Sequence, residues 1–167
     1  MRGTMRGAVL FLSGLIVGAG LMASVAAQGS LDRGMRLNHV GISVPNFQET
    51  VNHYEKVMGF RVSHRFAPNP DGRPGTAFVQ ISRDTFIEIA PAAADAKPSI
   101  THIGIGVDDI KATVARLNQN GGKATEPRRS ENSGSILANI TDPAGIRTEL
   151  NEQPAGSMMR QSIDSWK

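Results

Sequence analysis

Two histidines occupy matching positions in two copies of one sequence pattern. His39 lies in LNHVGISV (37–44), and His102 lies in ITHIGIGV (100–107), 63 residues further along the chain. Alternation along a strand gives each copy one aliphatic face and one face on which the histidine stands beside glycine or serine. These small neighbours leave space in front of each imidazole, whereas a packed core would fill it. An imidazole with open space in front of it is suited to binding a metal ion.

Each copy also ends with a strand that carries a glutamate. Glu88 lies in FIEI (86–89) and Glu149 lies in RTEL (147–150), and the two align once the second copy is shortened by two residues. A carboxylate on the concave side of a sheet is costly unless it is paired or holds a cation. The two histidines and two glutamates therefore predict one divalent metal site. A donor set without sulfur suits Zn, Ni, Co, Mn or Fe(II), with open positions left for water or substrate.

The repeat continues past the histidine strands, which indicates two copies of one unit made of a strand, a helix and three strands. We expect Asn46 to cap the first helix, with Glu49 as its reciprocal partner, and Gly59 to end it. Asp108 or Asp109 is expected to cap the second helix. The other expected strands are 60–66, 77–82, 85–90, 135–141 and 146–151.

The beginning of the chain has the composition of a secretory signal peptide. Segment 1–27 combines Arg2 and Arg6, an apolar run and the small residues that end at Ala27. We expect cleavage there, a secreted or periplasmic protein and no membrane contact afterwards; an uncleaved membrane anchor is the alternative. Cleavage lowers the formal net charge from +3 to +1, because two arginines and no acidic residue leave. Such a balance does not favour nucleic acid as a partner, and we interpret Arg128-Arg129 as part of a solvated loop.

The 167 residues contain no cysteine. This excludes a disulfide scaffold, a thiolate zinc site and a cysteine nucleophile. The functional chemistry is therefore expected to rest on imidazole and carboxylate groups.

The placement of His39, Glu88, His102 and Glu149 on equivalent strands resembles the vicinal oxygen chelate (VOC) superfamily. This group includes glyoxalase I, methylmalonyl-CoA epimerase, extradiol dioxygenases and bleomycin-resistance proteins. The resemblance implies an α+β fold in which two βαβββ modules form a cupped mixed sheet around a metal site.

The domain boundaries follow from the repeat and from composition. The VOC domain is expected over 37–152, preceded by a lead (28–36) and followed by a tail (153–167). One short helix in this tail is expected to dock Ile163 and Trp166. Within the domain, the expected parts are module one (37–91), a linker (91–99) and module two (100–152).

The order His, Glu, His, Glu is most similar to that of bacterial glyoxalase I. This resemblance implies a six-coordinate metal with two waters, a small-molecule substrate held by vicinal oxygens, and a homodimer. It also implies that a ligand glutamate, Glu149 or Glu88, moves a proton as the general base. Ser43 stands where glyoxalase I has an arginine for the glutathione carboxylate. We therefore predict a lyase or isomerase whose substrate is not based on glutathione.

Two other functions remain open at this point. In a ring-cleaving Fe(II) dioxygenase, His39, His102 and Glu149 would form a facial triad, but Glu88 adds a fourth ligand. A binding protein that sequesters a ligand without catalysis, like the bleomycin-resistance proteins, usually lacks the metal ligands. The intact quartet therefore favours an enzyme.

Candidate substrate contacts come from a loop and from the glutamate strands. The loop 67–75 contains three prolines and two glycines, and it is either a plain surface loop or a lid that brings Arg65 or Arg73 to an anionic substrate. Phe86 and Arg147, on the strands of the two glutamates, are further candidates.

Overall fold

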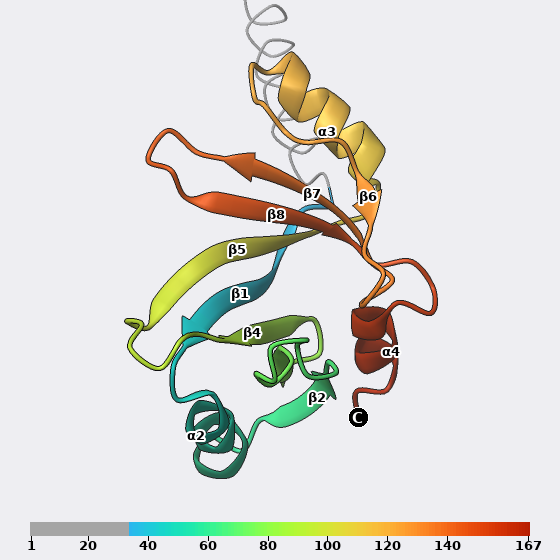
Figure 1. Ribbon diagram of the computed structural model, residues 1–167. Coiled ribbons are helices and arrows are strands. Elements are labelled where there is room, and N and C mark those ends of the chain that lie inside the picture. Colours follow the sequence, from blue (N-terminus) through green and yellow to red (C-terminus); the bar gives the residue numbers. More distant parts are fainter. Residues whose placement is uncertain (1–33) are drawn as a thin grey trace, which may run out of the picture. The chain divides into compact units, whose positions relative to one another are not determined.

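The computed structural model describes residues 34–167, and the predicted signal segment 1–27 lies outside the described residues. Figure 1 shows the elements in chain order. The first half contains β1 (Arg36–Val44), α2 (Phe47–Asn52), the π-helical turn η1 (His53–Val57), β2 (Arg61–Arg65), β3 (Ala77–Ser82) and β4 (Thr85–Pro91). The second half contains β5 (Ser99–Val107), α3 (Ile110–Gln119), β6 (Arg128–Arg129), β7 (Ile136–Thr141), β8 (Arg147–Glu152) and α4 (Met158–Asp164).

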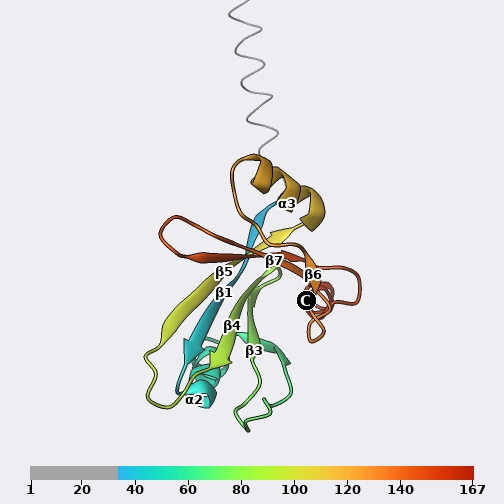
Figure 2. The ribbon, with the colours of Figure 1, turned by 45° about the horizontal axis from the view of Figure 1, so that its top comes forward.

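All eight strands form one mixed sheet in the order β2-β3-β4-β1-β5-β8-β7-β6. Each half is therefore one βαβββ module, with its first strand paired in parallel to its last. The modules meet edge to edge where β1 and β5 pair antiparallel, and these two strands run through the middle of the sheet in Figure 2. The α+β fold with two βαβββ modules is confirmed.

The aliphatic faces of the strands are covered by the two longer helical segments. In module one, Phe47 and Val51 of the first helix pack with Val44, Val79 and Ile89. In module two, α3 packs in the same way on the last strand of its own module, with these buried residues: Val107, Ile110, Val114, Ala138 and Leu150. Burying these side chains is the main stabilising contribution of each module. The opposite face of the sheet is left for the histidines and glutamates.

The helix ends confirm one expected cap and correct another. The carboxylate of Asp109 accepts a hydrogen bond from the backbone N–H of Ala112 at the start of α3, as predicted. The side chain of Asn46 makes no capping bond, so the expected capping box with Glu49 is wrong. Asn46 has φ −93° and ψ 56°, outside the extended conformation from which a cap residue reaches back to the helix.

The tail helix α4 packs on the same face of the sheet as the histidines. Its apolar side, formed by Met158, Met159 and Ile163, contacts Phe78 and Phe86. Phe86 pairs in register with His39, so this cluster lies directly beside the histidine strand. In Figure 1, α4 lies between β2 and β6.

The end of the tail is only partly docked. Ile163 is buried, as predicted, whereas Trp166 keeps 38% of its surface exposed. Its ring lies 5.7 Å from the guanidinium carbon of Arg61. Among residues 34–167, no helix is long and apolar enough to cross a membrane.

Candidate metal centre

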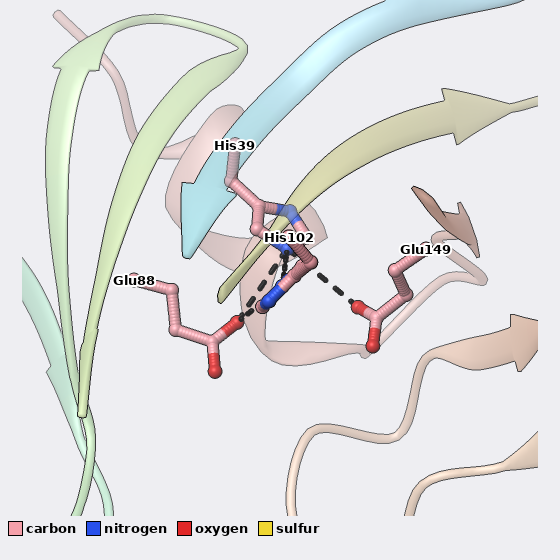
Figure 3. Close-up of side chains that lie close together, drawn as sticks. All are labelled: His39, Glu88, His102 and Glu149. Atoms are coloured by element: carbon pink, nitrogen blue, oxygen red, sulfur yellow. Dashed lines mark hydrogen bonds and ion pairs between the residues drawn. The ribbon is translucent and has the colours of Figure 1, made fainter. Parts of the chain in front are cut away.

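The two histidines face each other across the seam between β1 and β5. Antiparallel pairing places His39 opposite Gly104 and His102 opposite Gly41. The two Nε2 atoms come within 2.9 Å of each other. Glu88 and Glu149 stand on the flanking strands β4 and β8, beside those same glycines. Figure 3 shows the two glutamates approaching the imidazoles from opposite sides.

Each glycine in the repeat makes room for the histidine of the other strand. A methyl group built at Gly41 would overlap the His102 ring, and one built at Gly104 would overlap the His39 ring. In each copy the glycine follows the histidine by two residues. Because the two strands pair antiparallel, the glycine of each strand lies under the imidazole of the other. This packing is possible only where the side chain is a hydrogen atom.

A β-bulge before each histidine supplies the partner for its other ring nitrogen. The register shifts by one residue at Asn38 on β1 and at Thr101 on β5. The Nδ1 of His39 lies 2.8 Å from Asn38 Oδ1, and the Nδ1 of His102 lies 2.9 Å from Thr101 Oγ1. Such bonds orient the imidazole of a metal-binding histidine. Sequence reasoning missed both residues, although they precede the histidines at equivalent places in the repeat.

The distances within the quartet suit a single ion. The Oε2 of Glu88 lies 3.5 Å from the Nε2 of His39 and 3.4 Å from that of His102, and Glu149 Oε1 lies 3.6 Å from His39 Nε2. One ligand atom from each of the four residues lies within 4.8 Å of the other three. Around an octahedral ion with bonds near 2.1 Å, neighbouring donors are about 3 Å apart and opposite ones about 4 Å. The quartet can therefore hold a divalent metal with little rearrangement.

The pKa values of the quartet favour an added cation. Burial lowers the pKa of His39 from 6.5 to about 4, so this imidazole is neutral and ready to ligate at neutral pH. Burial alone would raise the pKa of Glu88, but the hydrogen bond from His102 and the nearby positive groups lower it overall. Burial, and then the charge of Glu88, raise the pKa of Glu149. The charge of Glu88 thus disfavours ionisation of Glu149, and a cation between the two carboxylates would remove this cost.

The four other predicted site residues differ in how near they lie to the quartet. The Arg147 guanidinium lies at the quartet, where Nη2 is 2.7 Å from His102 Nδ1. Phe86 is buried against α4, so it forms a wall rather than an open contact. Arg65, the last residue of β2, donates a hydrogen bond to Gln48 of α2, and Arg73 in the loop pairs with Asp71. Both arginines therefore have partners other than the quartet.

Arg128 has a small electrostatic effect on the site that sequence reasoning did not foresee. It is exposed to solvent, as predicted, but it lies on the short strand β6 rather than in a loop, opposite Leu137 of β7. Its charge acts on Glu149, whose pKa it lowers in part. No local pattern could have shown this, because the proximity arises only from pairing at the far edge of the sheet.

The sequence profile of the Glyoxalase/Bleomycin resistance protein/Dioxygenase superfamily matches residues 36–150. The chain belongs to this superfamily. Among curated relatives, a lactoylglutathione lyase from Salmonella typhimurium is 31% identical over 126 residues, which cover 71% of this chain and 93% of that one. A probable lactoylglutathione lyase from Synechocystis is 27% identical and covers 70% and 94%.

Solved structures of the superfamily share the fold. A methylmalonyl-CoA epimerase in complex with methylmalonyl-CoA and NH4+ matches with a TM-score of 0.62, at 24% identity, over 74% of this chain and 97% of that one. The epimerase from Mycobacterium tuberculosis matches with a TM-score of 0.60, at 23% identity, over 71% and 87%. The superfamily match ends at residue 150, whereas α4 begins at Met158. The helix that packs beside the quartet is therefore outside the part that defines this VOC domain.

We predict that Gly104→Ala destabilises the protein, because the added methyl group must displace the His39 ring. The expected loss is about 1–3 kcal/mol, the usual cost of overpacking. Gly106→Ala is the matched control on the same strand, since a methyl group there meets its nearest neighbours at 3.5 Å, an ordinary contact. Urea unfolding in the presence of EDTA measures both variants. Equal stability of the two would contradict the reciprocal packing of glycine and histidine.

We also predict that metal-free protein loses stability as the pH falls from about 6.5 to about 4. The unfolded chain takes up a proton at His39 near pH 6.5, but the folded chain does not until about pH 4. The stabilisation from neutral His39 is therefore full above this window and declines by about 3 kcal/mol across it. The raised pKa of Glu149 acts in the opposite direction and offsets part of this loss. His39→Gln should flatten that part of the stability profile, measured by urea unfolding at each pH. His53→Gln, at an exposed position of η1, should keep the wild-type slope.

Proposed function

We propose that the protein is a metal-dependent VOC enzyme that moves a proton on a small substrate with two vicinal oxygens, as a glyoxalase-like lyase or isomerase. One observation carries this proposal: two histidines and two glutamates, one of each from either module, converge on a single point. Loss of any one of them would leave an incomplete ligand set. The superfamily membership supports an enzyme of this kind.

In this proposal His39, His102, Glu88 and Glu149 hold one divalent ion. Zn, Ni, Co, Mn and Fe(II) all suit a set of two imidazoles and two carboxylates. When bound, the ion supplies Lewis-acid polarisation of the substrate oxygens. Both rings are held by their Nδ1 partners, so the chain keeps the Nε2 atoms aimed at one place.

We assign the general base to Glu149 and a constant ligand role to Glu88. The raised pKa of Glu149 makes its carboxylate the stronger base of the two, whereas Glu88 is held in the ionised form. Glu149 Oε2 lies 3.7 Å from Arg147, so the side chain has a second partner on the side away from His39. The carboxylate takes a proton from the carbon next to the substrate carbonyl and returns it to a neighbouring carbon or to the same one.

Two features support a compact substrate rather than a glutathione adduct. Ser43 on β1 offers no positive charge to a glutathione carboxylate. The apolar cluster of α4, Phe78 and Phe86 also fills one end of the concave face beside His39. A long substrate would have to displace this buried helix.

The arrangement favours the lyase or isomerase over the two alternatives. An Fe(II) oxygenase of the facial-triad type needs three protein ligands, but Glu88 approaches both imidazoles to within 3.5 Å. A non-catalytic binder has no need for four converging ligands. All four come from one chain, so the homodimer that we predict is not required to assemble the quartet.

The test of this proposal separates metal binding from proton transfer. His102→Ala should lower bound metal at least about tenfold, measured by elemental analysis after dialysis. Glu149→Gln should slow deuterium uptake from D2O into small α-hydroxycarbonyl compounds, followed by NMR, by about 10²-fold or more. His64→Ala on β2, outside the quartet, is the control and should change neither. Wild-type metal content in His102→Ala would refute the quartet as the metal site.

We further propose that the chain is exported and cleaved after Ala27. The supporting observation is the composition of segment 1–27, with its basic start and apolar run. Protein recovered from the periplasm or the medium of the native host should begin at Gln28 on amino-terminal sequencing. A chain that begins at Met1 in the membrane fraction would instead support the uncleaved anchor, and one in the cytosol would contradict export.

A further inference from the structure

The two halves of the site differ in charge at one pair of equivalent positions. With the offset that aligns the two glutamates, Phe86 on β4 corresponds to Arg147 on β8. Phe86 lies beside His39 and is sealed by α4. Arg147 lies beside His102, and its side chain keeps 40% of its surface exposed. One half of the site is therefore apolar and closed, and the other half is positively charged and open.

Hydrogen bonds determine which nitrogen of each histidine carries the proton. The Asn38 amide donates to the carbonyl of Asp84, which turns its Oδ1 toward His39. That oxygen only accepts, so the proton of His39 is on Nδ1 and its Nε2 is free.

The same reasoning gives the opposite result for His102. A guanidinium only donates, so Arg147 requires an unprotonated Nδ1 on His102. The proton of His102 is then on Nε2, which donates across 2.9 Å to the free Nε2 of His39. His39 is thus in the form that ligates a metal through Nε2, and His102 is not.

Metal binding through both Nε2 atoms requires His102 to change its tautomer. Its proton must leave Nε2 and occupy Nδ1, with no net change in protonation. The hydroxyl of Thr101 is 2.9 Å from that nitrogen and accepts the new N–H. Arg147 cannot keep its contact with Nδ1 of His102, because the N–H of the guanidinium and the new N–H of the imidazole would then face each other.

The released guanidinium stays near the site, is partly exposed and is free to bind an anion. It stays tethered, because Nη1 donates to Asn139 Oδ1 at 2.9 Å. A divalent ion would neutralise the charges of Glu88 and Glu149, and Arg147 and Arg128 would then leave an excess of positive charge. An oxyanion, carboxylate or phosphate, fits this charge and can bind a guanidinium in bidentate fashion.

We propose that Arg147 holds His102 in the non-ligating tautomer, and that metal binding releases its guanidinium to bind the oxyanion of an acidic substrate. The inference rests on the proposed metal site and narrows its substrate to small anions. Metal and anion then bind with positive coupling, since each favours the same position of Arg147.

The first test measures metal affinity without any activity assay. Arg147→Met should bind Co²⁺ about tenfold tighter than wild type in a chelator competition followed by absorbance, because His102 no longer has to lose a charged hydrogen bond. Arg128→Met is the control: it removes another positive charge that acts on Glu149, and its effect should stay below about threefold. Weaker or unchanged metal binding in Arg147→Met, relative to this control, would overturn the inference and leave the quartet intact. Absence of Co²⁺ binding in wild type would instead refute the proposed metal site, and the inference with it.

The second test observes the tautomer and the anion directly. In metal-free wild type, ¹⁵N NMR of the imidazoles should show His102 protonated at Nε2, and Arg147→Met should gain the Nδ1-protonated form. Acetate and methyl phosphate, titrated separately by calorimetry, should bind the Co²⁺-loaded wild type at least about tenfold tighter than loaded Arg147→Met. The tighter of the two identifies carboxylate or phosphate as the substrate's anionic group. Equal anion affinity in both proteins, or an Nδ1-protonated His102 in wild type, would contradict the proposal.

Discussion

The antiparallel pairing of β1 and β5 is the interaction on which the rest of the site depends. It places each repeat histidine opposite the glycine of the other strand, so each imidazole occupies space that a larger residue at the glycine would fill. The parallel partners β4 and β8 flank this pair, one on either side. Four ligands from both ends of the domain thus converge because one pair of strands has one register. A shift of one strand by one residue would turn its histidine to the helix-covered face, away from the other histidine.

The repeat explains the convergence, and its departures from symmetry explain what is specific to this protein. Asn38 and Thr101 occupy equivalent bulges and hold equivalent ring nitrogens, but only His102 has a second partner, Arg147. At the corresponding place in module one, Phe86 is covered by α4. The repeated arrangement thus provides the ligands, whereas the differences between the modules and the tail helix α4 give the site a closed side and an open one.

Charge balance is the second constraint on the site. Glu88 and Glu149 are mostly withdrawn from water, with 23% and 14% of their side chains exposed. Buried carboxylates at this separation are tolerated because imidazoles and arginines surround them, and they remain poised for a cation. The opposite directions of their pKa shifts show that equivalent positions in a repeat have acquired different environments. This difference between the two pKa values suits a site in which Glu88 remains a ligand and Glu149 acts as the base.

The sequence by itself determined the module order, the face of each strand and the four converging residues. These features are encoded locally, because alternation in a strand and the constant repeat spacing specify which side chains share a face. Only the tertiary structure decided that the modules join edge to edge within one chain, that α4 packs beside His39, and that Arg147 rather than Arg65 or Arg73 reaches the quartet. Strand pairing, helix docking and the direction of a long side chain depend on contacts between distant segments. A local sequence pattern does not specify which of several possible partners is nearest in space.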